Sequence, residues 1–177
     1  MNITKRWICC VCLLLGAASP PLLRSEISKA PDDGLPEAIE RFNEGYDLLV
    51  KEKYSEAASK FEVALQLHER FAQAHNNLAF ALRMQGPAHY EPSLTHYNRA
   101  IELSPRLAEP YAYRGTLYVL MGKNELAMKD YEKLRILNQG LAEELLVIIK
   151  TGAENKGGLL NAASKKIYKR TPVAKKE

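Results

Sequence analysis

The stretch that decides the fold runs from Ala108 to Tyr131 and reads AEPYAYRGTLYVLMGKNELAMKDY. It contains two apolar segments separated by the turn Met-Gly-Lys-Asn, and Gly115 lies in the middle of the first segment. A glycine inside a helix costs about 1 kcal/mol relative to alanine. We therefore expect that another helix approaches the backbone closely at Gly115, where a larger side chain would not fit.

The same arrangement of small and aromatic residues recurs at two other places in the chain. In the unit that starts at Ala108, small residues stand at Gly115 and Ala127, and an aromatic residue follows at Tyr131. Units that start at Ala38 and Ala72 carry the equivalent residues, which are Gly45, Ala57 and Phe61 in one and Ala79, Ser93, Tyr97 and Pro105 in the other. The three units span 38–71, 72–107 and 108–141. A period of this length indicates stacked helical repeats.

Each unit is expected to form two helices joined by a turn. The second helix of a unit has apolar residues three and four places apart, as amphipathic helices do. Gly86 and Gly122 stand where a left-handed residue would end the first helix, and Glu52 takes this place in unit one. Two antiparallel helices pack tightly where small side chains meet, so we expect Gly115 to face Ala127 at the crossing.

These residues resemble the tetratricopeptide repeat family, whose motif is Trp-x2-Leu-Gly-x2-Tyr, then Ala-x3-Phe, then Pro. Unit three resembles it most fully, through Tyr111, Gly115, Tyr118, Ala127 and Tyr131. The resemblance implies an all-α fold, a right-handed α-solenoid of three helix pairs. It also implies that a C-terminal capping helix at 141–152 covers the last unit, within a repeat domain of 36–152.

Proteins of this family generally act as scaffolds that hold a peptide or a partner helix in a concave groove. By resemblance, the first helix of each unit lines the groove with the residues Ile39, Phe42, Tyr46, Leu49, Asn76, Asn77, Phe80, Arg83, Glu109, Tyr113 and Thr116. The first four of these form an apolar stripe at helical spacing. If this stripe is exposed, it is a site for a peptide. The alternative is that the N-terminal linker or ordinary packing between repeats covers it.

One binding mode of the family is excluded by the residues present. Members that bind the acidic C-terminus of heat-shock chaperones use a clamp of lysine, asparagine and arginine side chains. The corresponding places here hold Phe42, Tyr46, Asn77, Glu109 and Tyr113, of which only Asn77 fits. Glu109 would repel a carboxylate. We therefore expect no chaperone-tail binding of this kind.

The first 18 residues have the layout of a secretory signal peptide. Lys5 and Arg6 precede an apolar run, and small residues follow up to Ala18. All three cysteines of the chain lie in this segment. We expect cleavage and export to a periplasmic or extracellular location in a bacterium; the alternative is an uncleaved membrane anchor. Residues 19–35 are expected to be a linker.

The charge of the chain is concentrated at its C-terminal end. Residues 153–177 contain seven basic and two acidic residues, and are expected to form a flexible basic tail. Such a tail could contact an anionic surface or be only a solvated segment. We expect a protein or peptide partner and no nucleic acid. Apolar residues at 145–149 allow a homodimer, which is not expected.

Residue types that carry chemistry are sparse and scattered. His68, His75, His89 and His96 show no spacing typical of metal ligands. The chain has no glycine-rich phosphate loop and no nucleophile elbow. We therefore expect no enzyme activity, metal or cofactor. Two functions remain. One is an exported interaction scaffold, with an envelope-complex assembly factor as a specific case. The other is a membrane-associated structural adaptor with a self-filled groove and a basic tail on an anionic surface.

Overall fold

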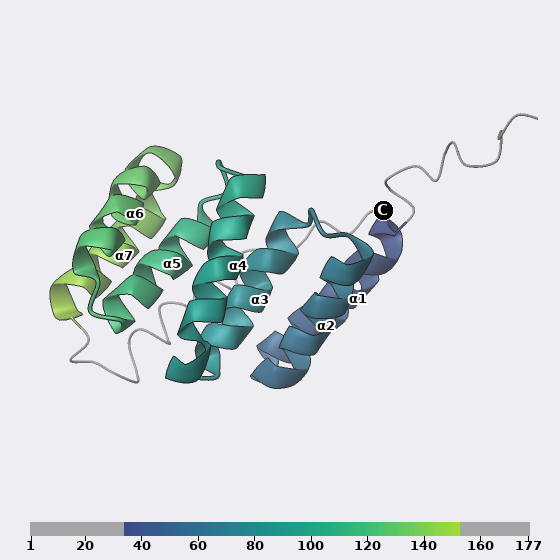
Figure 1. Ribbon diagram of the computed structural model, residues 1–177. Coiled ribbons are helices and arrows are strands. Elements are labelled where there is room, and N and C mark those ends of the chain that lie inside the picture. Colours follow the sequence, from purple (N-terminus) through teal and green to yellow (C-terminus); the bar gives the residue numbers. More distant parts are fainter. Residues whose placement is uncertain (1–33, 153–177) are drawn as a thin grey trace, which may run out of the picture. The chain divides into compact units, whose positions relative to one another are not determined.

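The computed structural model describes residues 34–152, which form seven α-helices and one short 3-10 helix (Figure 1). The elements are α1 (Leu35–Val50), α2 (Tyr54–Leu67), α3 (Ala72–Met84), η1 (Pro87–His89), α4 (Tyr90–Leu103), α5 (Glu109–Leu120), α6 (Asn124–Leu137) and α7 (Gln139–Thr151). This part of the chain contains no strand. The predicted leader at 1–18 and basic tail at 153–177 lie outside it, as does nearly all of the predicted linker.

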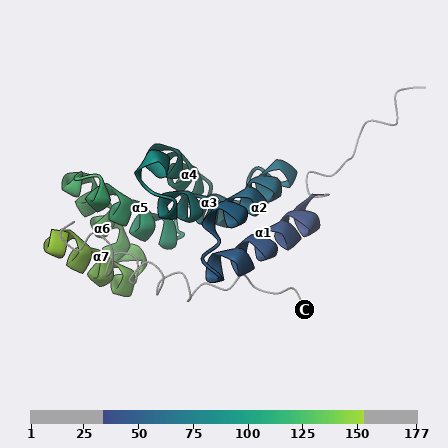
Figure 2. The same ribbon diagram turned by 90° about the horizontal axis from the view of Figure 1, so that it is seen from below.

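The helices pack in consecutive pairs. Helix α1 lies against α2, α3 against α4 and α5 against α6, and each second helix also contacts the first helix of the next pair. The first helix α3 contacts both α1 and α5, and α7 packs on both α5 and α6 (Figures 1 and 2). The three predicted helix pairs are therefore followed by one more helix, which covers the last pair.

Small residues stand where the helices of a pair cross. A Cβ atom added at Gly45 would lie only 2.8 Å from the Phe61 ring, which is closer than real Cβ contacts come. In the next pair, the buried Ser93 Oγ donates a hydrogen bond of 2.7 Å to the Ala79 carbonyl oxygen. Eight repeat-signature residues are buried, whereas Tyr131 is half-buried and Pro105 is exposed; the eight are Gly45, Ala57, Phe61, Ala79, Ser93, Tyr97, Gly115 and Ala127.

Gly115 is explained by a different neighbour from the one expected. A Cβ atom added there would lie 2.5 Å from Cδ2 of Leu145 in α7, and 3.4 Å from Cβ of Asp130 in α6. Ala127, the expected partner, instead packs with Val119 and Ile148. The nearest contacts therefore come from α7, which folds back over the pair α5–α6, and from Asp130 on α6, while the contact with Ala127 stays a prediction. The glycine makes room for the side chain of this final helix.

The turns after the first helices use residues with positive φ. Gly86 has φ +109° and Gly122 has φ +73°, as the sequence predicted. Glu52 has φ +61° at the equivalent place and is the one non-glycine residue with positive φ in residues 34–152. Such a conformation costs a residue with a side chain roughly 1–2 kcal/mol. Unit one therefore contains a strained turn that units two and three avoid.

Helix α7 begins at Gln139, two residues before the predicted start of the capping helix. The Asn138 side chain accepts a hydrogen bond of 3.2 Å from the Leu141 backbone N–H. A side-chain acceptor at this position satisfies a backbone donor that has no partner within the helix, and so fixes where the helix starts. Of its apolar residues, Leu145 and Ile148 are buried and Val147 is exposed. None of the helices in residues 34–152 has the length and apolar character needed to cross a membrane.

An ion pair joins the last helices. Arg114 on α5 donates two hydrogen bonds to the Asp130 carboxylate on α6, of 3.0 and 2.6 Å. Its remaining terminal nitrogen donates to Asn98 Oδ1 on α4 at 2.6 Å. Asp130 is buried, whereas the Arg114 side chain is partly exposed. This arrangement fixes three helices at one point, since bidentate pairs are geometrically specific.

Candidate functional site

The first helices α1, α3 and α5 carry the residues that were predicted to line a groove. The structure leaves Ile39, Tyr46 and Glu109 half-buried at the surface of these helices. The other eight predicted residues are buried; they are Phe42, Leu49, Asn76, Asn77, Phe80, Arg83, Tyr113 and Thr116. Most of the predicted groove residues therefore lie in the interior of the protein. Some of them are buried by one another.

Phe42 shows how one predicted groove residue is used in packing. Its ring lies 5.4 Å from that of Phe61 on α2 and 5.0 Å from that of Phe71, which directly precedes α3. These contacts fill the junction between the first and second helix pairs. Burial of an aromatic side chain here contributes about 3–5 kcal/mol to folding, judged by the cost of removing one. Phe42 is therefore a core residue. This agrees with the alternative given above, in which packing between repeats covers the apolar stripe.

Further along the face, aromatic rings link the second and third pairs. The Phe80 ring on α3 lies 5.3 Å from that of Tyr113 on α5, and Tyr113 lies 6.2 Å from Tyr97 on α4. The Arg83 guanidinium lies over the Phe80 ring at 5.1 Å from its centroid. These four residues form what we call the Arg83 cluster.

Burial sets the protonation of the two tyrosines in the Arg83 cluster. It raises the pKa of Tyr97 to about 12, although the charge of Arg83 works in the opposite direction. The pKa of Tyr113 is raised well above its ordinary value, mainly by burial and further by the neighbouring Tyr97. Both hydroxyl groups are therefore neutral at physiological pH. Arg83 provides the positive charge of the cluster.

The Arg83 cluster contains polar atoms without hydrogen-bond partners. Within residues 34–152, no group accepts from Nε, Nη1 or Nη2 of Arg83 with good hydrogen-bond geometry. The Tyr97 hydroxyl lies close enough to Arg83 and Ser93 for both to lower its pKa against the effect of burial. Arg83 is buried, with 3% of its surface exposed. Asn76, seven residues earlier on α3, donates through Nδ2 to the Asn77 Oδ1 at 3.0 Å but leaves its own Oδ1 without a partner. Buried polar groups of this kind are rare in folded proteins.

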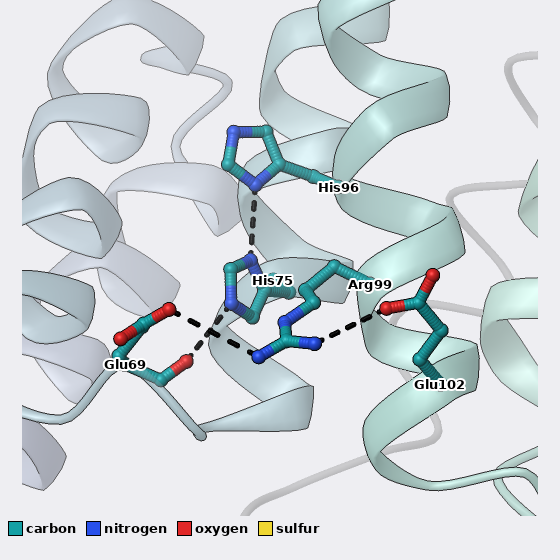
Figure 3. Close-up of polar contacts among 5 residues, drawn as sticks. All are labelled: Glu69, His75, His96, Arg99 and Glu102. Atoms are coloured by element: carbon teal, nitrogen blue, oxygen red, sulfur yellow. Dashed lines mark hydrogen bonds and ion pairs between the residues drawn. The ribbon is translucent and has the colours of Figure 1, made fainter.

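A second polar group is formed by residues of α3, of α4 and of the turn before α3 (Figure 3). Nδ1 of His75 lies 3.0 Å from Nδ1 of His96, and the two rings are stacked. Beside them, Arg99 forms an ion pair with Glu102 at 3.1 Å and a longer one with Glu69 at 3.9 Å. A cleft of about 310 Å³ is lined by Glu62, Leu65, Gln66, His75, Leu78 and His96.

The hydrogen bonds of the pair assign the ring protons. Nε2 of His75 lies 3.0 Å from the Glu69 carbonyl oxygen, which can only accept. His75 therefore carries its proton on Nε2, and its Nδ1 accepts from Nδ1–H of His96. Burial lowers the pKa of His75, and burial together with the neighbouring His75 lowers the pKa of His96 to about 4. Both rings are neutral at physiological pH.

The contact between His75 and His96 was missed because the two lie 21 residues apart in the sequence. The repeat pattern contained a usable signal. Ala79 on α3 and Ser93 on α4 meet at the helix crossing. Because the two helices are antiparallel, the residue four places before Ala79 lies near the residue four places after Ser93. That step leads from Ala79 to His75 and from Ser93 to Tyr97, the neighbour of His96. No group of three or more metal-ligating side chains occurs in residues 34–152.

Solved structures define the class of protein to which this fold corresponds. The second TPR domain of the human RPAP3 protein, in complex with the HSP70 peptide SGPTIEEVD, matches with a TM-score of 0.61 and 25% identity over 66% of this chain and 98% of that one. The second TPR domain of Spaghetti (RPAP3), bound to the HSP90 peptide SRMEEVD, matches with a TM-score of 0.58 and 23% identity over 63% of this chain and 100% of that one. The described residues therefore have the fold of a tetratricopeptide-repeat solenoid.

Relatives support this assignment at the level of sequence. Tetratricopeptide repeat protein 36 of Xenopus tropicalis is 30% identical over 119 residues, which are 65% of this chain and 58% of that protein. Its Homo sapiens counterpart is 34% identical over 99 residues, 54% of this chain and 51% of that protein. The chain thus spans little more than half the length of these relatives. No family model matches the chain.

Proposed function

We propose that this chain is a non-enzymatic interaction scaffold that binds a peptide or a partner helix along the face formed by α1, α3 and α5. The observation that carries the proposal is the Arg83 cluster, where three helices bring aromatic rings around a guanidinium that has no acceptor of good hydrogen-bond geometry in residues 34–152. Two structures of the same fold contain bound peptides, which supports a protein or peptide partner.

Half-buried residues mark where a peptide would contact this face. Ile39 and Tyr46 lie on α1 and Glu109 lies at the start of α5. Tyr46 and Glu109 both act electrostatically on Tyr113, which places them around the Arg83 cluster. A bound peptide would cover these side chains. It would add apolar contacts on the outer side of a face whose inner side packs on the buried rings. The contact would be small, and a few side chains would dominate the affinity.

The test is selection of peptides on the full chain, followed by variants of matched chemistry. Twelve-residue peptides from a random display library would be selected, and the Kd of a selected peptide would be measured by fluorescence anisotropy. Ile39→Glu on α1 is expected to weaken binding about tenfold, which corresponds to about 1.4 kcal/mol. Ile136→Glu is the control, because Ile136 is 83% exposed on α6. Equal affinities for both variants, or no selected peptide, would contradict the proposal.

A second candidate is supported by the burial of eight predicted groove residues. In this alternative, the groove is filled by the chain itself and the protein is a structural adaptor. An N-terminal segment and the basic residues of 153–177 would then hold it on an anionic membrane surface. Sedimentation with phosphatidylserine vesicles separates the two candidates. Removal of residues 153–177 abolishes sedimentation only if the protein is such an adaptor.

We further propose that the chain is exported and that its partner belongs to an assembly outside the cytoplasm, with a bacterial envelope complex as the specific case. The support is the signal-like order of charged, apolar and small residues in 1–18. The experiment is N-terminal sequencing of the protein recovered from its native cells. A mature start after Ala18 supports export with cleavage, and an intact Met1 supports an anchor or no export.

A further inference from the structure

We propose that His75 and His96 form a binding site for one divalent transition-metal ion, in which both Nδ1 atoms coordinate the ion and water completes its coordination. Helix α3 supplies one histidine and α4 the other, so a bound ion would join the two helices of the second pair. The sequence alone indicated no metal site, because the two residues lie 21 places apart. The site uses none of the residues predicted to line the groove and does not rest on the proposed function.

The distance between the two Nδ1 atoms suits a shared metal ion. Imidazole nitrogens bind such ions at about 2.0–2.1 Å. Because the Nδ1 atoms of His75 and His96 lie 3.0 Å apart, bonds of that length enclose an angle of about 90–100° at the metal. This angle is typical of tetragonal sites, which Cu²⁺ and Ni²⁺ prefer. A tetrahedral Zn²⁺ ion needs a nitrogen separation of about 3.3–3.4 Å, which a small opening of the pair would give.

The two rings are already oriented for an ion between them. Figure 3 shows the Nδ1 atoms facing each other, and the ring planes are 26° apart. The Glu69 carbonyl oxygen holds the His75 proton on Nε2, which leaves the Nδ1 lone pair directed at His96. Metal-binding histidines usually donate their other ring N–H in this way. His96 becomes a ligand when its proton moves from Nδ1 to Nε2, a change of tautomer that keeps the ring neutral.

The protonation state of the pair also favours a cation. An imidazole binds a metal ion only when its ring is neutral. Burial lowers the pKa of His75, and burial together with the neighbouring His75 lowers the pKa of His96 to about 4. At physiological pH, protons therefore do not compete with a metal ion for either ring.

Carboxylates near the pair offset the positive charge beside it. The charge of Arg99 acts on His75 and lowers its pKa, but Arg99 itself forms ion pairs with Glu69 at 3.9 Å and Glu102 at 3.1 Å. Glu62 on α2 lines the same cleft as the two histidines. These charged neighbours are thus three carboxylates and one guanidinium. Their sum is negative, which raises the local concentration of cations.

The cleft gives an ion access and leaves room for water. It has a volume of about 310 Å³, both histidines line it, and Glu62 and Gln66 on its α2 side are exposed. Because residues 34–152 contain no group of three metal-ligating side chains, water completes the coordination, and the Glu62 carboxylate can accept hydrogen bonds from that water. Imidazole and water suit Cu²⁺, Ni²⁺ and Zn²⁺, whereas Mg²⁺ and Ca²⁺ prefer oxygen ligands alone.

The first experiment titrates the full chain with Cu²⁺, Ni²⁺, Zn²⁺ and Mg²⁺ by isothermal calorimetry. Cys9, Cys10 and Cys12 are changed to serine in every protein, because thiolates bind these ions. We expect one ion per chain, with Cu²⁺ bound most tightly and Mg²⁺ not bound. His75→Gln and His96→Gln should each weaken Cu²⁺ binding at least about tenfold. The two changes together should weaken it by less than the product of the single effects, since both residues bind one ion.

The matched control is His89→Gln. His89 lies in η1 and does not line the cleft, so this change should leave the Cu²⁺ affinity as it is. Circular dichroism shows whether each variant is folded. The proposal is overturned if His96→Gln binds Cu²⁺ as tightly as His89→Gln does, or if Mg²⁺ binds as tightly as Cu²⁺.

A second measurement keeps every histidine and so does not depend on the folding of a variant. Paramagnetic Cu²⁺ broadens the NMR signals of nearby nuclei. Less than one equivalent added to the ¹⁵N-labelled chain should first broaden the amides around His75 on α3 and His96 on α4, while the amides of α7 stay sharp. Broadening that begins at His68 or His89 instead would place the ion elsewhere and overturn the proposal.

Discussion

Two arginines of this protein place a guanidinium in similar surroundings and differ in what it contacts. Arg114 meets the Asp130 carboxylate and Asn98 Oδ1, and aromatic rings flank it. Arg83 meets the Phe80 ring, and within residues 34–152 it meets no acceptor with good hydrogen-bond geometry. The first arginine fastens α4, α5 and α6 together. The second one lies over an aromatic ring and beside the Tyr97 hydroxyl, and makes no comparable ion pair in the described residues.

The largest effect is expected at the paired arginine. Arg114→Met leaves the Asp130 carboxylate buried without its partner, and should lower the free energy of unfolding by about 3–5 kcal/mol. Urea denaturation followed by circular dichroism measures this. The control is Arg135→Met, which breaks an exposed ion pair with Glu132 and should change stability by less than about 1 kcal/mol. The comparison fails if the two variants are equally stable, or if Arg114→Met is stabilising.

The next largest effect is expected at Gly115, which follows Arg114 on α5 and lets the Leu145 side chain approach the α5 backbone. Gly115→Ala introduces a Cβ against Leu145 and near Asp130, and should lower the free energy of unfolding by about 1–3 kcal/mol. The same change at Gly140, where an added Cβ meets only Asn138 at 3.5 Å, should be neutral or raise stability by up to about 1 kcal/mol. Opposite signs for the two glycines would confirm that close packing, rather than helix propensity, selects Gly115. A Gly115→Ala protein of unchanged stability would refute it.

Acidification tests a third buried group, the neutral pair His75 and His96. Both have a folded-state pKa below the ordinary value of 6.5, and for His96 it is about 4. The unfolded chain therefore takes up protons first, and the stability from the pair, present above pH 6.5, is lost as the pH falls towards 4. The shift of His96 alone corresponds to about 3.4 kcal/mol. Because its ring is partly exposed and solvent screens its charge, the loss should be smaller, about 2–3 kcal/mol. His96→Gln keeps a donor for His75 and should flatten this part of the curve of Tm against pH; an unchanged curve would assign the dependence to other groups.

The smallest effect is expected at the turn of unit one. Glu52→Gly should raise the free energy of unfolding by about 0.5–1 kcal/mol, because glycine adopts the observed φ of +61° without strain. Lys51, the preceding residue, has φ −84°, so Lys51→Gly should bring no gain. Thermal melting of the two variants distinguishes them. A gain from Lys51→Gly as well would mean that the turn is limited by something other than its left-handed residue.

The helix pairs were predictable because each unit has residues of the same kind at the same places. Gly45, Ala79 and Gly115 recur at one place in each unit, and Gly86 and Gly122 end first helices where the pattern placed them. The fold class was therefore confirmed. What the pattern could not give was the contact of Gly115 with Leu145, because Leu145 lies in a helix that has no counterpart in the repeat.

The candidate site was predicted less completely for a similar reason. The groove places follow from the family register, but the register does not say how deeply each side chain is buried. Phe42 fills a junction between pairs because Phe71 lies beside it, and Phe71 is not a groove residue. Arg83 was named as a groove residue, but its lack of an acceptor depends on what surrounds it in space. The sequence shows which side chains can donate hydrogen bonds. Only the tertiary structure shows whether an acceptor lies within reach of them.

The close fit of Leu145 over Gly115 has a consequence for how the array ends. A final helix that lay on the surface could fray without disturbing anything beneath it. Here the α7 side chain occupies space inside the crossing of α5 and α6, so detaching α7 exposes the interior of the last pair. The amides of α5 should therefore exchange with deuterium at a rate set by the release of α7. Helix α7 therefore holds the last helix pair closed, and the rate at which α7 detaches limits how long that pair stays intact.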